Sequence, residues 1–535
     1  MKFCFKELVS KEWCSGMLVY AILSTLLVSD GLVARGELPD GLQEWFRFCL
    51  NCFPWTLVVM IPLWIFGGRS RHLYASIVAA AVVFESIEWF VRIKFHMILL
   101  GDWIGIVMGS SFEEVKWFIS NYLGLTFFVS VFGVLILACG LGWGAWQSRH
   151  VKVSRVTIVA ALLSFSTFVY GTSLTTNKLA VFDRLTIVKV FVDSIRSFSD
   201  YRMLSKMRFA PQIPSSACLK TNMVNNVIGV VVLGESATRN HLGLYGYTRD
   251  TTPCLSARRD RLICYSDVVT PSSGTAEAMR YIFTTRTLER RSDFRYTMAQ
   301  VMRKVGFDVS LYSNQERWGQ WDGDETFDFA GCEPMCFMGE MNATNRFDEI
   351  LLPYLKNAVS QSASNLVVFV HLNGSHQPPE TKYPHDCVPF LSDKCYKESV
   401  NHYDNSIWYT DYVLEGMIKI LEETKQPCWL MYLSDHGETP SSNGWRVATD
   451  SDLWEVPLVF WFSNEFRDLY PQRVMALERA KDLPLQSDQL FYGVLLFAGV
   501  DRLGVNSEDI FTDSAFVPRP CRLIQQGQVK YNNGK

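Results

Sequence analysis

Long apolar runs in the first 175 residues constrain the fold of this 535-residue chain more than any other feature. Five of these runs have about the length that a bilayer demands, roughly 20 residues. They cover residues 17–34, 49–66, 73–91, 123–146 and 156–172. Residues 1–175 are therefore predicted to form a bundle of about five transmembrane helices. A cleaved signal peptide is not expected, because no small-residue cleavage site stands out.

The distribution of lysine and arginine predicts the orientation of these spans, because short cytoplasmic loops carry an excess of positive residues. With the N-terminus inside, the inner segments hold Lys2, Lys6, Lys11, Arg69, Arg71, Arg149, Lys152 and Arg155. An odd number of spans then places the rest of the chain on the outer side of the membrane. We expect residues 176–222 to form a linker with an interfacial helix, and residues 223–535 to form a globular domain.

Cysteine usage agrees with an outer, oxidising compartment. Nine of the 14 cysteines lie after residue 200, and several are closely spaced. The pairs predicted to form small disulfide loops are Cys332/Cys336, Cys387/Cys395 and, as a weaker third, Cys254/Cys264. A zinc knuckle is the alternative, but the spacing lacks the CxxC pairs that such sites use.

Three apolar runs in the globular part, two of them rich in β-branched residues, each end in side chains that can bind a metal. They are NNVIGVVVLGES (225–236), NLVVFVHLNGSH (365–376) and WLMYLSDHGE (429–438). Helical patterns such as 404–424 lie between them, which predicts an α/β domain with a mostly parallel central sheet. Because ligands bind beyond the carboxyl ends of such strands, we expect Glu235, Asp435 and His436 to meet.

A mixed set of carboxylates and imidazole favours Zn²⁺ or Mn²⁺ over Ca²⁺ and Mg²⁺, which prefer oxygen ligands alone. Any single one of these residues could instead belong to a turn or cap a helix. The net charge of −3 gives no reason to expect a nucleic-acid partner. The metal site is therefore the functional feature that the sequence predicts.

A hydroxyl group that could act as a nucleophile lies in VVTPSSGTAEAMRYIF (268–283), where small residues lead into a helical pattern. Ser272, Ser273 and Thr275 all fall near the start of that helix, where the positive end of the helix dipole stabilises negative charge. One of them could also be a simple N-cap. The spacing does not choose among the three.

Several motifs together resemble the membrane-anchored phosphoethanolamine transferases, which include enzymes that modify lipid A. The matching segments are GES (234–236), LYGYTRDTTP (244–253), SSGTAEAM (272–279), HLNGSH (371–376), NHYDNSIWYTDYVL (401–414) and SDHGE (434–438). The resemblance covers nearly the whole chain. It implies five spans and an extracytoplasmic domain of the alkaline phosphatase/sulfatase type.

The resemblance also implies roles for individual residues. Zinc would be bound by Glu235, Thr275, Asp435 and His436, and Thr275 would be the nucleophile. His376 resembles a residue that binds the substrate phosphate or a second metal, and Glu438 lies close by in sequence. Ser110 and Glu114 match the segment that holds the headgroup of the donor lipid.

The implied activity is transfer of phosphoethanolamine from phosphatidylethanolamine to a lipopolysaccharide lipid A, a core sugar or another envelope glycan. The implied location is the bacterial inner membrane, with several spans in the bilayer and the catalytic domain in the periplasm. The sequence departs from the family at Ile106, Pro271, Tyr281 and Ala448, and at the SNQ of 313–315. These departures weaken the case for a lipid A acceptor and for a second metal.

Three other functions remain open at this point. A phosphoglycerol transferase similar to lipoteichoic acid synthases would keep the fold and change the donor lipid. Sulfatase chemistry is less favoured, because CLSAR (254–258) lacks the proline of the sulfatase nucleophile signature. A catalytically inactive protein that binds lipid or glycan would leave several buried acids without a cation, which is costly.

Overall fold

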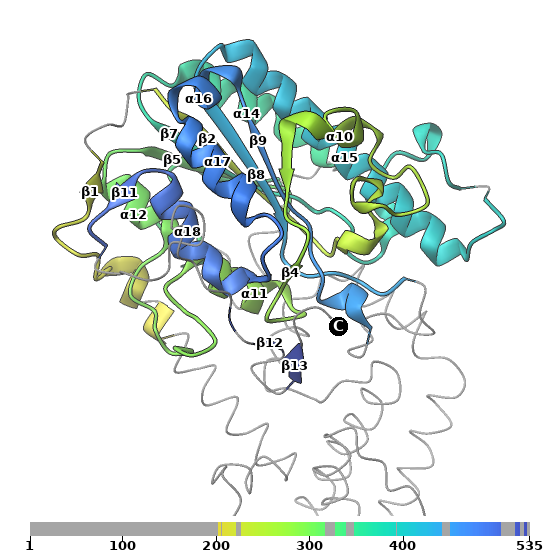
Figure 1. Ribbon diagram of the computed structural model, residues 1–535, viewed down its shortest axis with the longest axis horizontal. Helices are drawn as coiled ribbons and strands as arrows, with labels where there is room; N and C mark the ends of the chain where they lie inside the picture. Colours follow the sequence, from red (N-terminus) through yellow and green to blue (C-terminus); the bar gives the residue numbers. More distant parts are fainter. Residues whose placement is uncertain are drawn as a thin grey trace, which may run out of the picture. The chain divides into compact units, whose positions relative to one another are not determined.

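The computed structural model describes the chain from residue 202 onward, with gaps (Figure 1). The described residues are 202–204, 206–220, 226–315, 327–338, 347–391, 393–440, 450–503, 519, 521–524 and 529–531. The five predicted spans, Ser110, Glu114 and Ala448 lie outside these ranges. Within them, no helix is both long enough and apolar enough to cross a bilayer.

A seven-stranded sheet forms the centre of the described domain, in the order β3-β9-β8-β2-β7-β5-β6. In that order the strands are Leu262–Cys264, Leu458–Phe462, Cys428–Ser434, Ile228–Gly234, Leu366–His371, Asp308–Ser313 and Met335–Phe337. The five strands from β8 to β6 pair in parallel, whereas β9 and β3 are antiparallel to their neighbours. The α/β prediction is confirmed, and the sheet is mixed with a parallel majority.

Helices cover both faces of this sheet (Figure 1). One apolar cluster joins the sheet to α11 (Thr275–Phe283), α12 (Met298–Lys304), α16 (Asn464–Leu469), α17 (Pro471–Ala480) and α18 (Leu490–Phe497). The other cluster joins it to α10 (Pro253–Ala257), α14 (Leu351–Gln361) and α15 (Glu398–Thr424). Burial on both faces is why these strands are almost entirely apolar.

Strand β2 shows this two-sided burial residue by residue. Val231 and Leu233 point into the first cluster, whereas Val230 and Val232 point into the second. Successive side chains of a strand alternate between faces, so a run of β-branched residues fills both cores at once. Strand β2 therefore lies at the middle of the domain, with β8 and β7 on either side.

Three short two-stranded sheets complete the described strands. They pair β4 (Val268–Val269) with β10 (Leu485–Gln486), β1 (Cys218–Leu219) with β11 (Val500–Asp501), and β12 (Arg522–Ile524) with β13 (Val529–Tyr531). The pairing of β4 with β10 is parallel. It fixes the segment that leads from β4 into α11, which carries one of the candidate nucleophiles.

The predicted disulfides are corrected by the structure. Cys332 and Cys336 are free thiols that pack against opposite faces of the sheet, so their sulfur atoms do not face each other. The other cysteines of the predicted pairs that the structure describes as free are Cys254, Cys264 and Cys395. Close spacing in sequence was a poor guide here, because β6 carries Cys336 to the far side of the sheet from Cys332.

The contact between Gly229 and Trp429 gives a test of the core. These residues pair across β2 and β8, and a Cβ atom at position 229 would lie 2.3 Å from the Trp429 ring. Because the buried ring has no room to move, we expect Gly229→Ala to lower the free energy of unfolding by about 1–3 kcal/mol. Chemical denaturation of the full chain followed by circular dichroism measures this loss.

The matched control adds Trp429→Leu to Gly229→Ala. The smaller side chain removes the clash, so the double variant should lose less stability than the sum of the two single variants. Strictly additive losses would contradict the assignment of the clash to this ring.

Candidate metal centre

The turn after β2 presents Glu235 at the carboxyl end of the sheet. The next residue, Ser236, has a φ of +59°, a left-handed conformation that is uncommon for serine. This conformation turns the chain sharply, and Ser236 Oγ donates a hydrogen bond of 2.7 Å to Glu235 Oε1. The Glu235 carboxylate is thereby held inside the protein, with almost no exposure to solvent.

The loop after β7 supports Glu235 from the other side. The N–H of Ser375 donates to the Glu235 carbonyl at 2.9 Å. Gly374 has a φ of +51°, and a Cβ atom there would lie 2.7 Å from the same carbonyl oxygen. The two loops can approach this closely only because residue 374 is glycine.

Asp435 and His436 follow β8 at the same edge, since Gly234 of β2 pairs with Ser434 of β8. Asp435 Oδ1 accepts a hydrogen bond from the Ser236 N–H at 3.0 Å, which ties the two strand ends together. The ring of His436 is oriented by its Nδ1, which lies 2.8 Å from the Gly437 carbonyl. A carbonyl only accepts, so Nδ1 is the donor in this contact, and Nε2 is the ring nitrogen that faces the carboxylates of Glu235 and Asp435.

Gly437 is required by the next segment of the chain. A Cβ atom at this position would lie 1.9 Å from the carbonyl oxygen of Asp452, and the Gly437 N–H donates to the Leu453 carbonyl at 3.0 Å. The DHG motif therefore consists of two candidate ligands followed by a glycine. This glycine allows the close approach of the backbone at residues 452–453.

Thr275 is the first residue of α11, and its side chain faces these groups. Thr275 Oγ1 lies 3.1 and 3.2 Å from the two carboxylate oxygens of Glu235. It also lies 3.4 Å from Nε2 of His436. Ser272 points elsewhere, because its Oγ donates to Glu277 Oε2 at 3.0 Å and accepts from the Gly274 N–H. The geometry thus brings the Thr275 hydroxyl to the candidate ligands.

The spacing of the donor atoms suits a tetrahedral cation. Ligand atoms of Glu235, Asp435 and His436 all lie within 4.8 Å of one another. Nε2 of His436 is 3.5 Å from Glu235 Oε1 and 3.3 Å from Asp435 Oδ2. Zinc bonds of about 2.0–2.1 Å in a tetrahedron would separate neighbouring ligand atoms by about 3.3 Å. The two separations that involve His436 Nε2 are close to this value.

The charges at the site also fit a cation. The side chains of Glu235, Asp435 and His436 have no exposure to solvent. Asp435 Oδ2 is buried and has no hydrogen-bond donor among the residues that the structure describes. Two carboxylates this close in a dry environment repel each other unless positive charge is bound between them. Carboxylates, an imidazole and a hydroxyl form a donor set that Zn²⁺ accepts.

Of the other predicted site residues, the structure describes Glu438 and His376, whereas Ser110 and Glu114 lie outside the described residues. Glu438 is fully buried, and its Oε1 accepts a hydrogen bond of 3.0 Å from the Thr439 N–H. His376 is partly buried, and its Nδ1 donates to the Gln377 carbonyl at 2.9 Å. The roles of both residues, and those of Ser110 and Glu114, stay predictions.

Sequence reasoning missed the residues that support the candidate ligands. Asp348 is buried, and its carboxylate accepts hydrogen bonds from the N–H groups of Asn373 at 2.8 Å and of Gly374 at 2.9 Å. Ser434 Oγ accepts from the Ala237 N–H at 2.9 Å. The glycine of HLNGSH was a usable signal for a tight turn, whereas nothing in the sequence around Asp348 indicates its contact with that turn.

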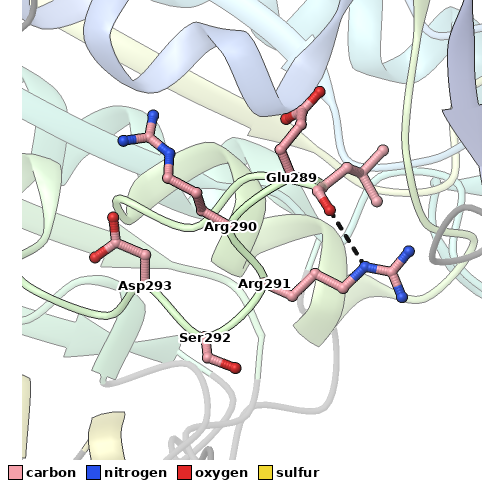
Figure 2. A pocket seen from close by; sticks show the side chains of 6 residues that line it. Glu289, Arg290, Arg291, Ser292 and Asp293 are labelled. Atoms are coloured by element: carbon pink, nitrogen blue, oxygen red, sulfur yellow. Dashed lines mark hydrogen bonds between the residues drawn. The ribbon is translucent and has the colours of Figure 1, made fainter.

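A surface hollow of about 580 Å³ lies on the loop after α11, lined by residues 288–293 (Figure 2). Arg290 and Arg291 point away from each other on this loop, and Arg291 Nε donates to the Leu288 carbonyl at 3.3 Å. None of the candidate metal ligands lines this hollow. The candidate metal site is therefore identified by the convergence of its ligand side chains, and the hollow is a separate feature.

Comparison with known families identifies the class of protein that this fold and site define. The sulfatase family matches residues 228–500, just over half of the chain. The chain belongs to this family. The match begins at β2, which delivers Glu235, and it includes α11 and β8, which deliver Thr275, Asp435 and His436.

Several curated relatives of this chain are phosphoethanolamine transferases by name. The chain is 27% identical to phosphoethanolamine transferase EptA of Helicobacter pylori, over 73% of this chain and 77% of that protein. It spans about half the length of several other curated relatives named phosphoethanolamine transferases.

Two solved structures are similar in fold. The first is the integral membrane protein lipooligosaccharide phosphoethanolamine transferase A of Neisseria meningitidis. It has a TM-score of 0.64 and 19% identity, and the match covers 92% of this chain and 98% of that chain. The second is the periplasmic domain of EptC from Escherichia coli in complex with Zn. It has a TM-score of 0.52 and 21% identity, over 58% of this chain and 92% of that chain.

Removal of one candidate ligand tests the metal centre. We expect the full chain to bind Zn²⁺, and we expect Asp435→Asn to lower the affinity by more than about 100-fold. Even the mutation of a residue that only supports a metal ligand lowers metal affinity about 10–100-fold. Competition with a chromophoric chelator measures the affinity. Bound zinc should also raise the melting temperature of the wild-type chain.

Asp488→Asn is the matched control, because Asp488 is another fully buried carboxylate that pairs with Arg519 and takes no part in the cluster. The control should bind zinc as the wild type does. Equal loss in both variants would mean that buried acids support the fold in general and that residue 435 is no ligand.

Proposed function

We propose that this protein is a zinc-dependent transferase that moves phosphoethanolamine from phosphatidylethanolamine to an acceptor in the cell envelope. The observation that carries the proposal is the position of Thr275 Oγ1, which lies 3.1–3.4 Å from Glu235 and His436 at the start of α11. The relatives named phosphoethanolamine transferases support the choice of the transferred group. A hydroxyl in this position is suited to accept a phosphoryl group.

Glu235, Asp435, His436 and Thr275 are the residues that would hold the cation. When bound there, a Zn²⁺ ion would lower the pKa of the Thr275 hydroxyl and offset negative charge on the phosphoryl group. The Zn complex of the similar EptC domain supports zinc as the metal, and Mn²⁺ is the alternative that the donor set allows.

The first step that we propose is attack by Thr275 Oγ1 on the phosphorus of phosphatidylethanolamine. A bond forms between this oxygen and phosphorus, and the bond from phosphorus to the diacylglycerol oxygen breaks. The threonine proton leaves, and the diacylglycerol oxygen takes up a proton. The N–H groups in the first turn of α11 lack helical partners by geometry, so they are suited to contact the phosphoryl oxygens.

The second step transfers the group from Thr275 to the acceptor. A hydroxyl or phosphate oxygen of a lipopolysaccharide lipid A, a core sugar or another glycan attacks the phosphorus. The bond from phosphorus to Thr275 Oγ1 breaks, and this oxygen takes up a proton. We assign His376 to binding of the phosphoryl group or to protonation of the leaving oxygen. We assign Glu438, Ser110 and Glu114 to contacts with the substrate.

The membrane anchor follows from the donor lipid. Diacylglycerol leaves the reaction inside the bilayer, so an enzyme tethered to the membrane meets both its donor and its lipid product there. We propose that residues 1–175 form the transmembrane helices, 176–222 the linker and 223–535 the periplasmic catalytic domain. The similarity to an integral membrane protein of Neisseria meningitidis over 92% of this chain supports this organisation.

Covalent labelling of Thr275 tests the mechanism. Full-length protein incubated with phosphatidylethanolamine should gain one phosphoethanolamine group on the peptide that contains Thr275, detected by mass spectrometry. Thr275→Ala removes the attacking oxygen and should lower transfer by several orders of magnitude. Thr275→Ser is the matched control, because it keeps a hydroxyl at the same position and should retain labelling. Full activity of Thr275→Ala would refute the mechanism.

Labelled donor lipids distinguish the two transferase functions. With phosphatidylethanolamine and phosphatidylglycerol each carrying a labelled headgroup, we expect label from the first lipid alone to reach Thr275 and then the acceptor. Label from phosphatidylglycerol would instead assign the chain to phosphoglycerol transfer. Mass spectrometry of lipid A, core oligosaccharide and envelope glycans from cells with and without the gene identifies the acceptor.

A further inference from the structure

The hydroxyl of Tyr403 reaches from α15 to the turn that carries Glu235. It donates a hydrogen bond to the Ser236 carbonyl at 2.7 Å and accepts one from the Thr238 N–H at 2.8 Å. Tyr403 has no exposure to solvent, so water does not take over either bond. A single oxygen atom on α15 therefore bridges two backbone groups of the turn after β2.

We propose that Tyr403 is a positioning residue for the metal cluster. Its hydroxyl fixes the backbone of the 235–238 turn, and this turn sets the Glu235 carboxylate and the Ser236 N–H that holds Asp435. The proposal rests on the divalent cation of the proposed function and is independent of the identity of the transferred group.

The turn needs such support because its backbone is strained. Ser236 has a left-handed φ of +59°, and non-glycine residues adopt it stably only where the surroundings hold them in it. Hydrogen bonds to Asp435, Ser434 and Ser375 hold the side of the turn that faces the sheet. Tyr403 supplies the bonds on the side that faces α15. Without its hydroxyl, two buried backbone groups would lose their partner.

Tyr403 is itself held in one position by its ring. The ring packs in a small apolar cluster with Ala237, Leu242 and Ile407. It also meets the ring of His241 edge to face, with 5.2 Å between the ring centres. Burial raises the pKa of the Tyr403 hydroxyl well above its ordinary value, so the group keeps the proton that it donates.

The neighbouring residue Asp404 anchors this part of α15 to the chain after the turn. Its buried carboxylate lies 2.6 Å from His241 Nδ1 and 2.6 Å from a guanidinium nitrogen of Arg249, and Tyr247 donates to it at 3.0 Å. These contacts are charge-assisted and strong. These contacts hold α15 in place, so the Tyr403 hydroxyl has a fixed position relative to the turn. A positioning role requires such rigidity.

Tyr403→Phe tests the proposal, because it deletes one oxygen and keeps the packed ring. We expect the affinity of the full chain for Zn²⁺ to fall about 10–100-fold, as is usual when a residue that orients a metal ligand is lost. Competition with a chromophoric chelator measures this affinity. Hydrogen exchange followed by mass spectrometry should show faster exchange in the peptide that contains Thr238 and unchanged exchange in the peptides of β5 and α14.

Tyr409→Phe is the matched control on the same helix. Tyr409 is also buried, but its ring stacks on Tyr412 and packs against Phe347 instead of the turn. This control should bind zinc as the wild type does. Unchanged zinc affinity in Tyr403→Phe, or an equal loss in both variants, would overturn the positioning role.

Two measurements on the wild-type chain keep the test decisive if Tyr403→Phe fails to fold. Slow exchange of the Thr238 peptide supports the bond to Tyr403, and fast exchange refutes it. Zinc binding by the wild type separates the two proposals. A wild type that binds no zinc would refute the proposed function. A wild type that binds zinc but shows fast exchange in the Thr238 peptide would refute the positioning role alone.

Discussion

The parallel pairing of β2 with β8 is the constraint on which the rest of the site depends. Gly234 and Ser434 lie side by side at the ends of the two strands, so the chain leaves the sheet twice at the same place. Glu235 follows one strand, and Asp435 and His436 follow the other. A shift of the register by one residue would turn every side chain of one strand to the opposite face and move Glu235 away from Asp435 and His436.

The glycines and backbone hydrogen bonds around the cluster turn this register into a precise arrangement of atoms. Gly374 lets the loop after β7 press against Glu235, and Gly437 lets the segment at 452–453 press against the end of β8. The Tyr403 hydroxyl bonds to the backbone of the turn that follows Glu235. The candidate ligands are therefore surrounded by contacts that leave their oxygen and nitrogen atoms facing a shared centre.

The sequence predicted the parts of the fold that depend on local pattern. The three apolar runs form β2, β7 and β8, because a strand buried on both faces has to be apolar throughout. It also predicted that Glu235, Asp435 and His436 would meet. The choice of Thr275 over Ser272 needed the structure or the family resemblance, because local spacing does not show which hydroxyl faces the acids and which one bonds to Glu277.

Contacts between side chains and distant backbone groups were the part that the sequence did not reveal. The side chains of Asp348 and Tyr403 form hydrogen bonds with backbone groups. Every residue type carries the same backbone carbonyl, and all but proline carry the same N–H, so the sequence does not indicate such partners. The disulfide prediction was wrong for a related reason, since the spacing of Cys332 and Cys336 gives no information about the faces of the sheet to which they point.

The order of the ligands along the chain has a consequence for how the protein matures. Glu235 and Thr275 lie in the first part of the described α/β domain, whereas Asp435 and His436 come only with β8, after the long helix α15. A growing chain that ends before β8 has half of the donor set and no dry enclosure around it. For the metal centre that we propose, high-affinity capture of the ion would then have to wait until the sheet is built, which would tie acquisition of the metal to completion of folding.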